Sequence, residues 1–117
     1  MPLAPSLKAR WREALRSGDF KPARVSWALG PSRLCCLSVL AKVIKPDLVY
    51  GSDNARKLFD PDDGTHVDGG WLKPRTGLTE GDMGRFIHMN DADRLTFAEI
   101  AARIDEACSD APEQEAA

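Results

Sequence analysis

The sequence predicts a small, mainly helical α+β domain, with about three main helices around a central buried helix and a small irregular sheet or long loop in the middle of the chain. One observation is the apolar run over residues 32–44, which places apolar side chains on every side of a helix. Another is amphipathic helical spacing near both ends of the chain, which is lost over residues 47–76. The 117 residues suit one domain, so we expect a single globular domain over residues 1–109 and a disordered acidic tail over residues 110–117.

The first helix is expected from Leu7 to about Ser17. Apolar residues recur at helical spacing from Leu7, include Trp11, and leave a basic opposite face. Ser6 is a candidate cap for the first turn. Gly18 can adopt the left-handed conformation that commonly ends a helix. Core packing of the apolar face is the favoured interpretation, although basic amphipathic helices also bind nucleic acid and membranes.

The central helix is expected to begin at Ser32, whose hydroxyl can accept a hydrogen bond from an amide of the first turn. It should end before Pro46, because the residue before a proline is disfavoured in the helical conformation. Residues 21–31 are predicted to form a connector anchored by Trp27, since two prolines and Gly30 interrupt any helix there. At about a dozen residues the central helix is too short to span a bilayer.

The middle of the chain, residues 47–76, contains short extended candidates and a strong turn signal. Residues 48–50 favour an extended conformation. Residues 58–59 and 65–67 flank the turn sequence Asp-Pro-Asp-Asp-Gly at residues 60–64. We expect a small irregular antiparallel sheet or a long ordered loop that leads into Trp71 and Leu72.

The last third of the chain carries two helix signals. A short helix is expected over residues 79–87, followed by a polar turn over residues 88–93. Thr96 and Glu99 form a capping box, in which each side chain bonds the backbone amide of the other residue. This box predicts a helix that runs to about Ser109.

Composition and charge restrict the class of protein. Apolar content of 43% and charged content of 29% indicate a globular protein rather than a disordered or membrane one. The N-terminus lacks the layout of a signal peptide, so a cytoplasmic location is expected. Residues 1–45 carry nine Lys and Arg against two acids, a net charge of +7, whereas residues 46–117 carry seven against sixteen, a net charge of −9. This division indicates either a basic face for an acidic partner or attraction between the two halves within the fold.

Cys35 and Cys36 are the sharpest candidates for chemistry. A thiol at a helix N-terminus can have a lowered pKa and act as a nucleophile, and His88 or Asp91 would then orient or activate it. The alternative is that both cysteines are small core residues, since free cysteine is among the most buried residue types. We favour the core interpretation, and a non-enzymatic protein over a thiol-dependent enzyme.

No cofactor or metal is expected. The three cysteines and two histidines are scattered, without the compact spacing of a zinc site. The acidic turn at residues 60–68 breaks the order of an EF-hand loop, because Gly64 stands at its fifth position. No glycine-rich phosphate loop and no hydrolase elbow occur.

A protein partner is the favoured expectation, with nucleic acid as a possibility through the basic N-terminal third. An overall pI near 5.6 and the lack of a recognition signature argue against a dedicated nucleic-acid binder. The candidate binding residues combine cations of the first helix with large side chains of the middle segment: Arg12, Arg16, Tyr50, His66 and Trp71.

Three separated pieces of the sequence form a recognisable combination. Residues 11–18 read W-R-E-A-L-R-S-G, residues 35–40 read C-C-L-S-V-L, and M-N-D at residues 89–91 precedes F-A-E-I-A-A-R-I at residues 97–104. Together they resemble a widespread group of small bacteriophage and prophage proteins with the pattern W-x2-A-L-R-S-G, C-C-L-G-V-L, L-N-D and F-x2-I-A-x2-I. The resemblance covers about half of the chain. Ser38 and Met89 depart from this pattern, and Pro22 stands where relatives often have the glutamine that favours a thiol enzyme.

The resemblance implies a small phage or prophage accessory protein and brings no particular activity. It favours non-enzymatic binding to a host or phage macromolecule, with modulation of host defence as one such role. A phage structural component is a further alternative. Within the fold, we expect Asn90 and Asp91 to cap or turn the chain into the last helix, since Asn and Asp bond their own nearby backbone.

Overall fold

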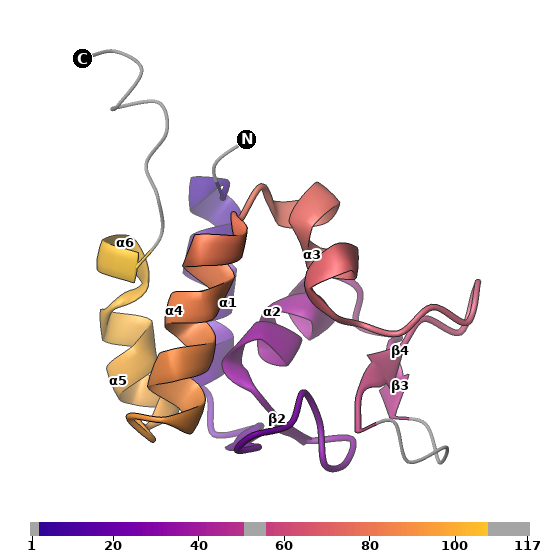
Figure 1. The fold of residues 1–117 in the computed structure, drawn as a ribbon, viewed down its shortest axis with the longest axis horizontal. Helices are drawn as coiled ribbons and strands as arrows, with labels where there is room; N and C mark the ends of the chain where they lie inside the picture. Colours follow the sequence, from indigo (N-terminus) through magenta and orange to yellow (C-terminus); the bar gives the residue numbers. More distant parts are fainter. Residues whose placement is uncertain (1–2, 51–55, 108–117) are drawn as a thin grey trace.

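The helix α2, Cys36–Ile44, lies at the centre of the computed structural model, which describes residues 3–50 and 56–107. Its first six residues are all buried, as expected for a helix that is apolar on every side. Figure 1 shows three helices side by side on one flank of α2 and a further helix on the other flank. The prediction of a mainly helical α+β domain around a buried central helix is confirmed. The surrounding helices are α1, Pro5–Arg16, α3, Gly69–Thr76, α4, Glu80–Asp91, α5, Phe97–Ala102, and the short α6, Ile104–Ala107.

The central helix begins four residues later than predicted, because the preceding residues form a strand. Strand β2, Arg33–Leu34, pairs in parallel with β1, Lys21–Pro22. On its other side β2 runs antiparallel to residues 27–29, with hydrogen bonds of 2.9 Å from Cys35 N to Trp27 O and from Leu29 N to Arg33 O. The backbone of this segment is thus engaged in sheet pairing, and the predicted Ser32 cap is wrong. We call the three segments, residues 21–23, 27–29 and 33–35, the ribbon.

The first helix is confirmed, but it begins at Pro5 rather than Leu7. Proline suits the first turn because the amide that it lacks would have no partner there. The residue at the cap position is Ala4, so the predicted cap at Ser6 is wrong. Gly18 has the expected left-handed conformation, with φ of 82°.

The middle segment forms the predicted small antiparallel sheet. Strands β3, Val49–Tyr50, and β4, Leu58–Phe59, pair with each other, and Phe59 also bridges to His66. Gly64 closes the intervening acidic turn with φ of 75°.

Helix α3 was not predicted, because its sequence contains two glycines and a proline that disfavour helix. Its two ends explain why it forms. The Asp68 side chain caps the helix by accepting a hydrogen bond from Trp71 N, and Gly77 ends it in the left-handed conformation.

Helix α4 continues to Asp91, so the predicted end at Ile87 and the predicted polar turn over residues 88–93 are wrong. Asn90 is fully buried within the helix, and it does not turn the chain into α5. The capping box of Thr96 and Glu99 is confirmed. The predicted last helix is divided at Arg103 into α5 and α6, and its expected end at residue 109 and the expected tail lie outside the described residues.

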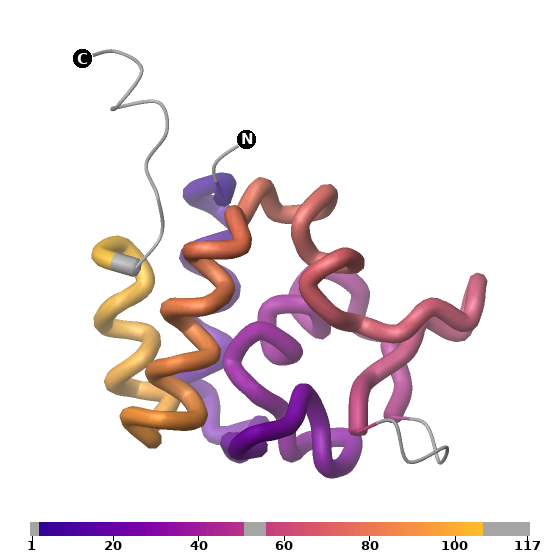
Figure 2. Tube along the Cα trace, in the orientation of Figure 1, coloured from indigo at the N-terminus to yellow at the C-terminus, as the bar shows by residue number. Residues whose placement is uncertain are grey.

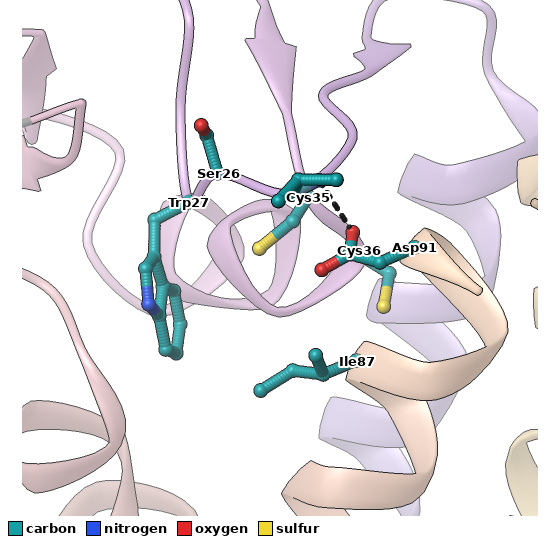
Figure 3. A pocket seen from close by; sticks show the side chains of 7 residues that line it. Ser26, Trp27, Cys35, Cys36, Ile87 and Asp91 are labelled. Carbon is teal, nitrogen blue, oxygen red and sulfur yellow. Dashed lines mark hydrogen bonds between the residues drawn. The ribbon is translucent and has the colours of Figure 1, made fainter.

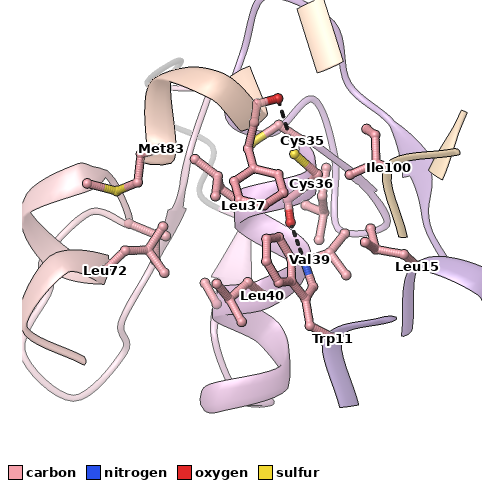
Figure 4. Close-up of a cluster of buried hydrophobic side chains, with 14 of the residues drawn as sticks. Trp11, Leu15, Cys35, Cys36, Leu37, Val39, Leu40, Leu72, Met83 and Ile100 are labelled. Atoms are coloured by element: carbon pink, nitrogen blue, oxygen red, sulfur yellow. Dashed lines mark hydrogen bonds between the residues drawn. The ribbon is translucent and has the colours of Figure 1, made fainter. Parts of the chain in front are cut away.

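The core joins α1, α2 and α4. The Trp11 and Phe86 rings lie 4.8 Å apart between centroids, and Trp11 Nε1 donates to the carbonyl of Cys36 at 2.9 Å. Figure 4 shows Trp11 beside the apolar side chains of α2. Within the described ranges, no helix has both the length and the apolar character that a membrane crossing requires.

Candidate functional site

The loop over residues 23–29 is held against the end of α4 by a buried amide. Asn90 Nδ2 donates to Ala23 O at 2.7 Å and to Asp91 Oδ1 at 2.7 Å, while Asn90 Oδ1 accepts from Cys36 N at 3.2 Å. One side chain thereby fixes the loop, the end of α4 and the first turn of α2. In Figure 2 the chain that follows α1 passes beside this end of α4.

Two further side chains tie the same loop to the turn after α4. Arg24 Nη1 donates to the carbonyl of Asn90 and, at 3.0 Å, to the carbonyl of Leu95. Asp91 Oδ1 accepts from Val25 N at 2.9 Å. The loop is therefore held in one conformation by contacts from a segment more than 60 positions away in the chain.

Val25 is the strained and exposed residue of the loop. Its φ of 61° lies in the left-handed region, which β-branched residues rarely adopt. Such a conformation costs on the order of 1–3 kcal/mol and persists only where the surroundings impose it. The side chain is 79% exposed, so no burial offsets this cost.

A small hollow lies beside Val25. Figure 3 shows Trp27 from the ribbon and Ile87 from α4 on two sides of it. The hydrogen bond from Val25 N to Asp91 Oδ1 joins two of its lining residues. Its volume is about 80 Å³. Ile87 is 37% exposed, and Trp27 is half-buried. We call this feature the Val25 hollow; its lining consists of Val25, Ser26, Trp27, Cys35, Cys36, Ile87 and Asp91.

Cys35 and Cys36 contribute buried thiols to the hollow. Burial raises the pKa of both thiols, and the negative charge of Asp91 adds to the rise. Cys35 Sγ lies 3.5 Å from Ser38 Oγ, and Cys36 Sγ lies 3.5 Å from Phe86 O. Both thiols are therefore protonated at neutral pH, which is the opposite of what a nucleophile requires.

Asp91 lines the same hollow as Cys35, whereas His88 does not. The His88 imidazole is 65% exposed, and its Nε2 lies 3.3 Å from Asp93 Oδ1. It lines a separate groove between α4 and α6 rather than the Val25 hollow. A carboxylate beside a buried thiol, without an imidazole between them, does not make a thiolate. The thiol-enzyme hypothesis stays a prediction, and this geometry weighs against it.

The five predicted binding residues lie in different places. Arg12 donates to Ala101 O at 3.3 Å and pairs with Asp105 at 3.2 Å, so it ties α1 to α5 and α6. Arg16 is exposed. Tyr50 and His66 are half-buried on the small sheet. Trp71, expected at the surface, is only 4% exposed. The Arg75 guanidinium covers its ring at 4.1 Å from the centroid.

Much of the basic N-terminal third is engaged within the fold. Arg10 donates to Val43 O at 2.8 Å, and Lys8 lies 3.7 Å from Asp105. The pairs of Lys8 and Arg12 with Asp105 support the expectation that the two oppositely charged halves attract each other. They also leave fewer cations for phosphates than the sequence suggests. In the described part of the chain, no group of three or more His, Cys, Asp or Glu is placed to hold a metal ion.

No protein-family model matches the chain, and no curated protein or solved structure matches it significantly. The site residues must therefore be assigned from their own geometry. Sequence reasoning missed Val25 and Ile87, because an isolated valine in a connector and one isoleucine of a helix give no signal. It singled out Asn90 and Asp91 but assigned them to a turn rather than to the network that holds the loop.

Proposed function

We propose that this chain is a small phage or prophage accessory protein that acts by binding another protein through the surface at Val25 and Ile87, with modulation of host defence as its setting. The observation that carries the proposal is the strained, 79% exposed Val25 beside an apolar hollow. Strain held at an exposed apolar residue is typical of a functional surface rather than of folding.

The phage assignment rests on the motif resemblance, and the contacts among the motif residues fit a binding role. Trp11 bonds the carbonyl of Cys36, and Asn90 bonds its amide. The three motif pieces therefore meet around one residue of α2. They build the core and the loop conformation, which supports a scaffold for a surface rather than a catalytic constellation.

The test uses Val25→Asn. Asparagine adopts the left-handed conformation readily, so the variant should be more stable than the original chain by about 1 kcal/mol. It should also lose its partner, because the exposed apolar side chain is gone. Tagged protein would be used to capture partners from a lysate of the bacterial host, and stability would be measured by urea unfolding.

Val49→Asn is the matched control. It makes the same chemical change at a residue that is 39% exposed on β3, away from the hollow. A protein captured by the original chain and by this control, but not by Val25→Asn, supports the proposal. Equal capture by all three chains overturns it.

A further inference from the structure

We infer that the partner segment is acidic and inserts one branched aliphatic side chain into the Val25 hollow. This inference rests on the proposed function and adds the chemistry of the partner. It starts from the ribbon beside the hollow, whose strand register decides which side chains share its outer face.

The outer face of the ribbon carries two adjacent cations. Lys21 and Arg33 are register partners in the parallel pair β1–β2, and both are exposed. Side chains of register partners lie on the same face of a sheet, and like charges placed opposite each other destabilise the pair. Among the described residues, no acidic side chain forms an ion pair with Lys21 or Arg33.

The cations continue into apolar surface. Leu29 is opposite Arg33 across the antiparallel side of the ribbon, and it is 41% exposed. Two residues along, Trp27 is opposite Cys35, and both line the hollow. On the outer face, the two cations Lys21 and Arg33 are therefore followed by Leu29 and then by the Val25 hollow.

The size of the hollow indicates what enters it. A cavity of about 150 Å³ holds a benzene ring, so the hollow of about 80 Å³ suits a smaller group. A branched aliphatic side chain of Val, Leu or Ile has that size and complements the Trp27 and Ile87 walls.

The charges select an acidic partner. Carboxylates of one partner segment could pair with both Lys21 and Arg33, which favours and orients the approach of an acidic segment. Asp91, the acid at the hollow, has its Oδ1 committed to Val25 N and Asn90 Nδ2. A nucleic acid would use the cations but would leave the aliphatic hollow unfilled.

The experiment selects random displayed dodecapeptides on the immobilised chain and removes those that also bind the Val25→Asn variant. The expected peptides contain Asp or Glu next to one Val, Leu or Ile. Fluorescence anisotropy of the best peptide should show about tenfold weaker binding to Arg33→Glu, and weaker binding to the original chain as salt rises. Replacing the aliphatic residue of the peptide by Ala should also weaken binding.

The outcomes separate this inference from the proposed function. Selected peptides that depend on Val25 but lack acidic residues overturn the acidic partner and leave the binding surface in place. Failure to recover any peptide that distinguishes Val25→Asn, together with tight binding of a labelled oligothymidine, overturns both and favours nucleic acid. A best peptide that binds Arg33→Glu and the original chain equally also overturns the acidic partner.

Discussion

At the scale of single residues, the buried side-chain amide of Asn90 joins three segments that are far apart in the sequence. Asn90 satisfies the carbonyl of Ala23 and the amide of Cys36, both fully buried. Buried backbone groups without a partner are rare because they have lost water without gaining a protein contact. The side chain is therefore a structural requirement for the loop that presents Val25.

The change Asn90→Leu should destabilise the chain by about 2–4 kcal/mol, because two buried backbone groups lose their partner. Urea unfolding followed by circular dichroism measures the difference. Asp93→Asn, a change at a side chain that is 47% exposed, is the control and should have little effect. A loss below about 0.5 kcal/mol for Asn90→Leu would contradict the network.

Cys35 and Cys36 should react slowly with a thiol reagent in the native state. Both are buried, and burial raises the pKa of each thiol, so little thiolate is present or accessible. In a Cys108→Ser background, which removes the third thiol, labelling should be about a hundredfold slower than in urea. Rapid labelling that disappears in Cys35→Ala would instead revive the thiol-enzyme hypothesis.

At the scale of elements, α3 is stabilised by the capping interactions at its ends rather than by the helix propensity of its interior residues. Its mid-helix Pro74 and its two N-terminal glycines disfavour a helix, whereas Asp68 bonds Trp71 N at 3.1 Å. The helix packs against α4 and carries Trp71 and Leu72 into the core. A cap that is worth little in a strong helix therefore matters more here.

The change Asp68→Ala should cost about 1–2 kcal/mol, since the first turn of α3 loses its cap. Asp68→Asn keeps a capping oxygen and removes the charge that lies 3.8 Å from Lys57, so it separates the cap from the ion pair. Thermal unfolding of the two variants measures this difference. Equal losses would show that the ion pair, and not the cap, is what Asp68 supplies.

At the scale of the whole molecule, ion pairs within the fold join the basic first part of the chain to the acidic remainder. Lys8 and Arg12 meet Asp105, and Lys45 lies 2.6 Å from Asp62 and 3.7 Å from Asp60. Contacts of this kind at the surface contribute little individually. The Lys8 and Arg12 contacts hold the first helix against α6, and the Lys45 contacts hold the residue after α2 against the acidic turn.

Raising the pH above about 9 should destabilise the folded protein. Burial raises the thiol pKa values of Cys35 and Cys36 above the ordinary value of 9.0, so above pH 9.0 only the unfolded state releases these protons. The hydrogen bond to Asp62 raises the pKa of Lys45 above 10.5. The stability that this bond contributes is present at lower pH and is lost as the pH rises through the raised pKa. All three groups therefore act in the same direction.

Melting temperature measured from neutral pH upward should fall once pH exceeds about 9. Cys36→Ala should show a shallower fall, although it is less stable at neutral pH. An exposed-site control such as Val49→Asn should keep the original slope. A slope that is unchanged in Cys36→Ala would contradict the assignment of the effect to the buried thiols.

The sequence predicted the elements whose signals are local. Examples are the capping box at Thr96, the apolar run of α2 and the glycine after α1. Each of these signals involves residues only a few positions apart in the sequence. The sequence could not predict that Arg33 and Leu34 form a strand, because that choice depends on pairing with residues 21–22 and 27–29. Tertiary pairing here overrides local helix preference.

The candidate site was less predictable than the fold. Val25 lies in the left-handed region with its amide bonded to Asp91, 66 positions later in the chain. Trp71 was expected on the surface because large side chains mark binding sites, but the unpredicted α3 carries it inward. Residues whose role depends on a distant partner leave no local trace.

The wide sequence separation of the Asn90 contacts has a consequence for the order of events during synthesis. The loop that carries Val25 leaves the ribosome well before Asn90, which lies 54 positions after Cys36 and 67 after Ala23. Until α4 has emerged, Val25 N lacks the Asp91 carboxylate that accepts its hydrogen bond, and Ala23 O lacks Asn90. Under the proposed function, the binding surface is therefore complete only after α4 has left the ribosome.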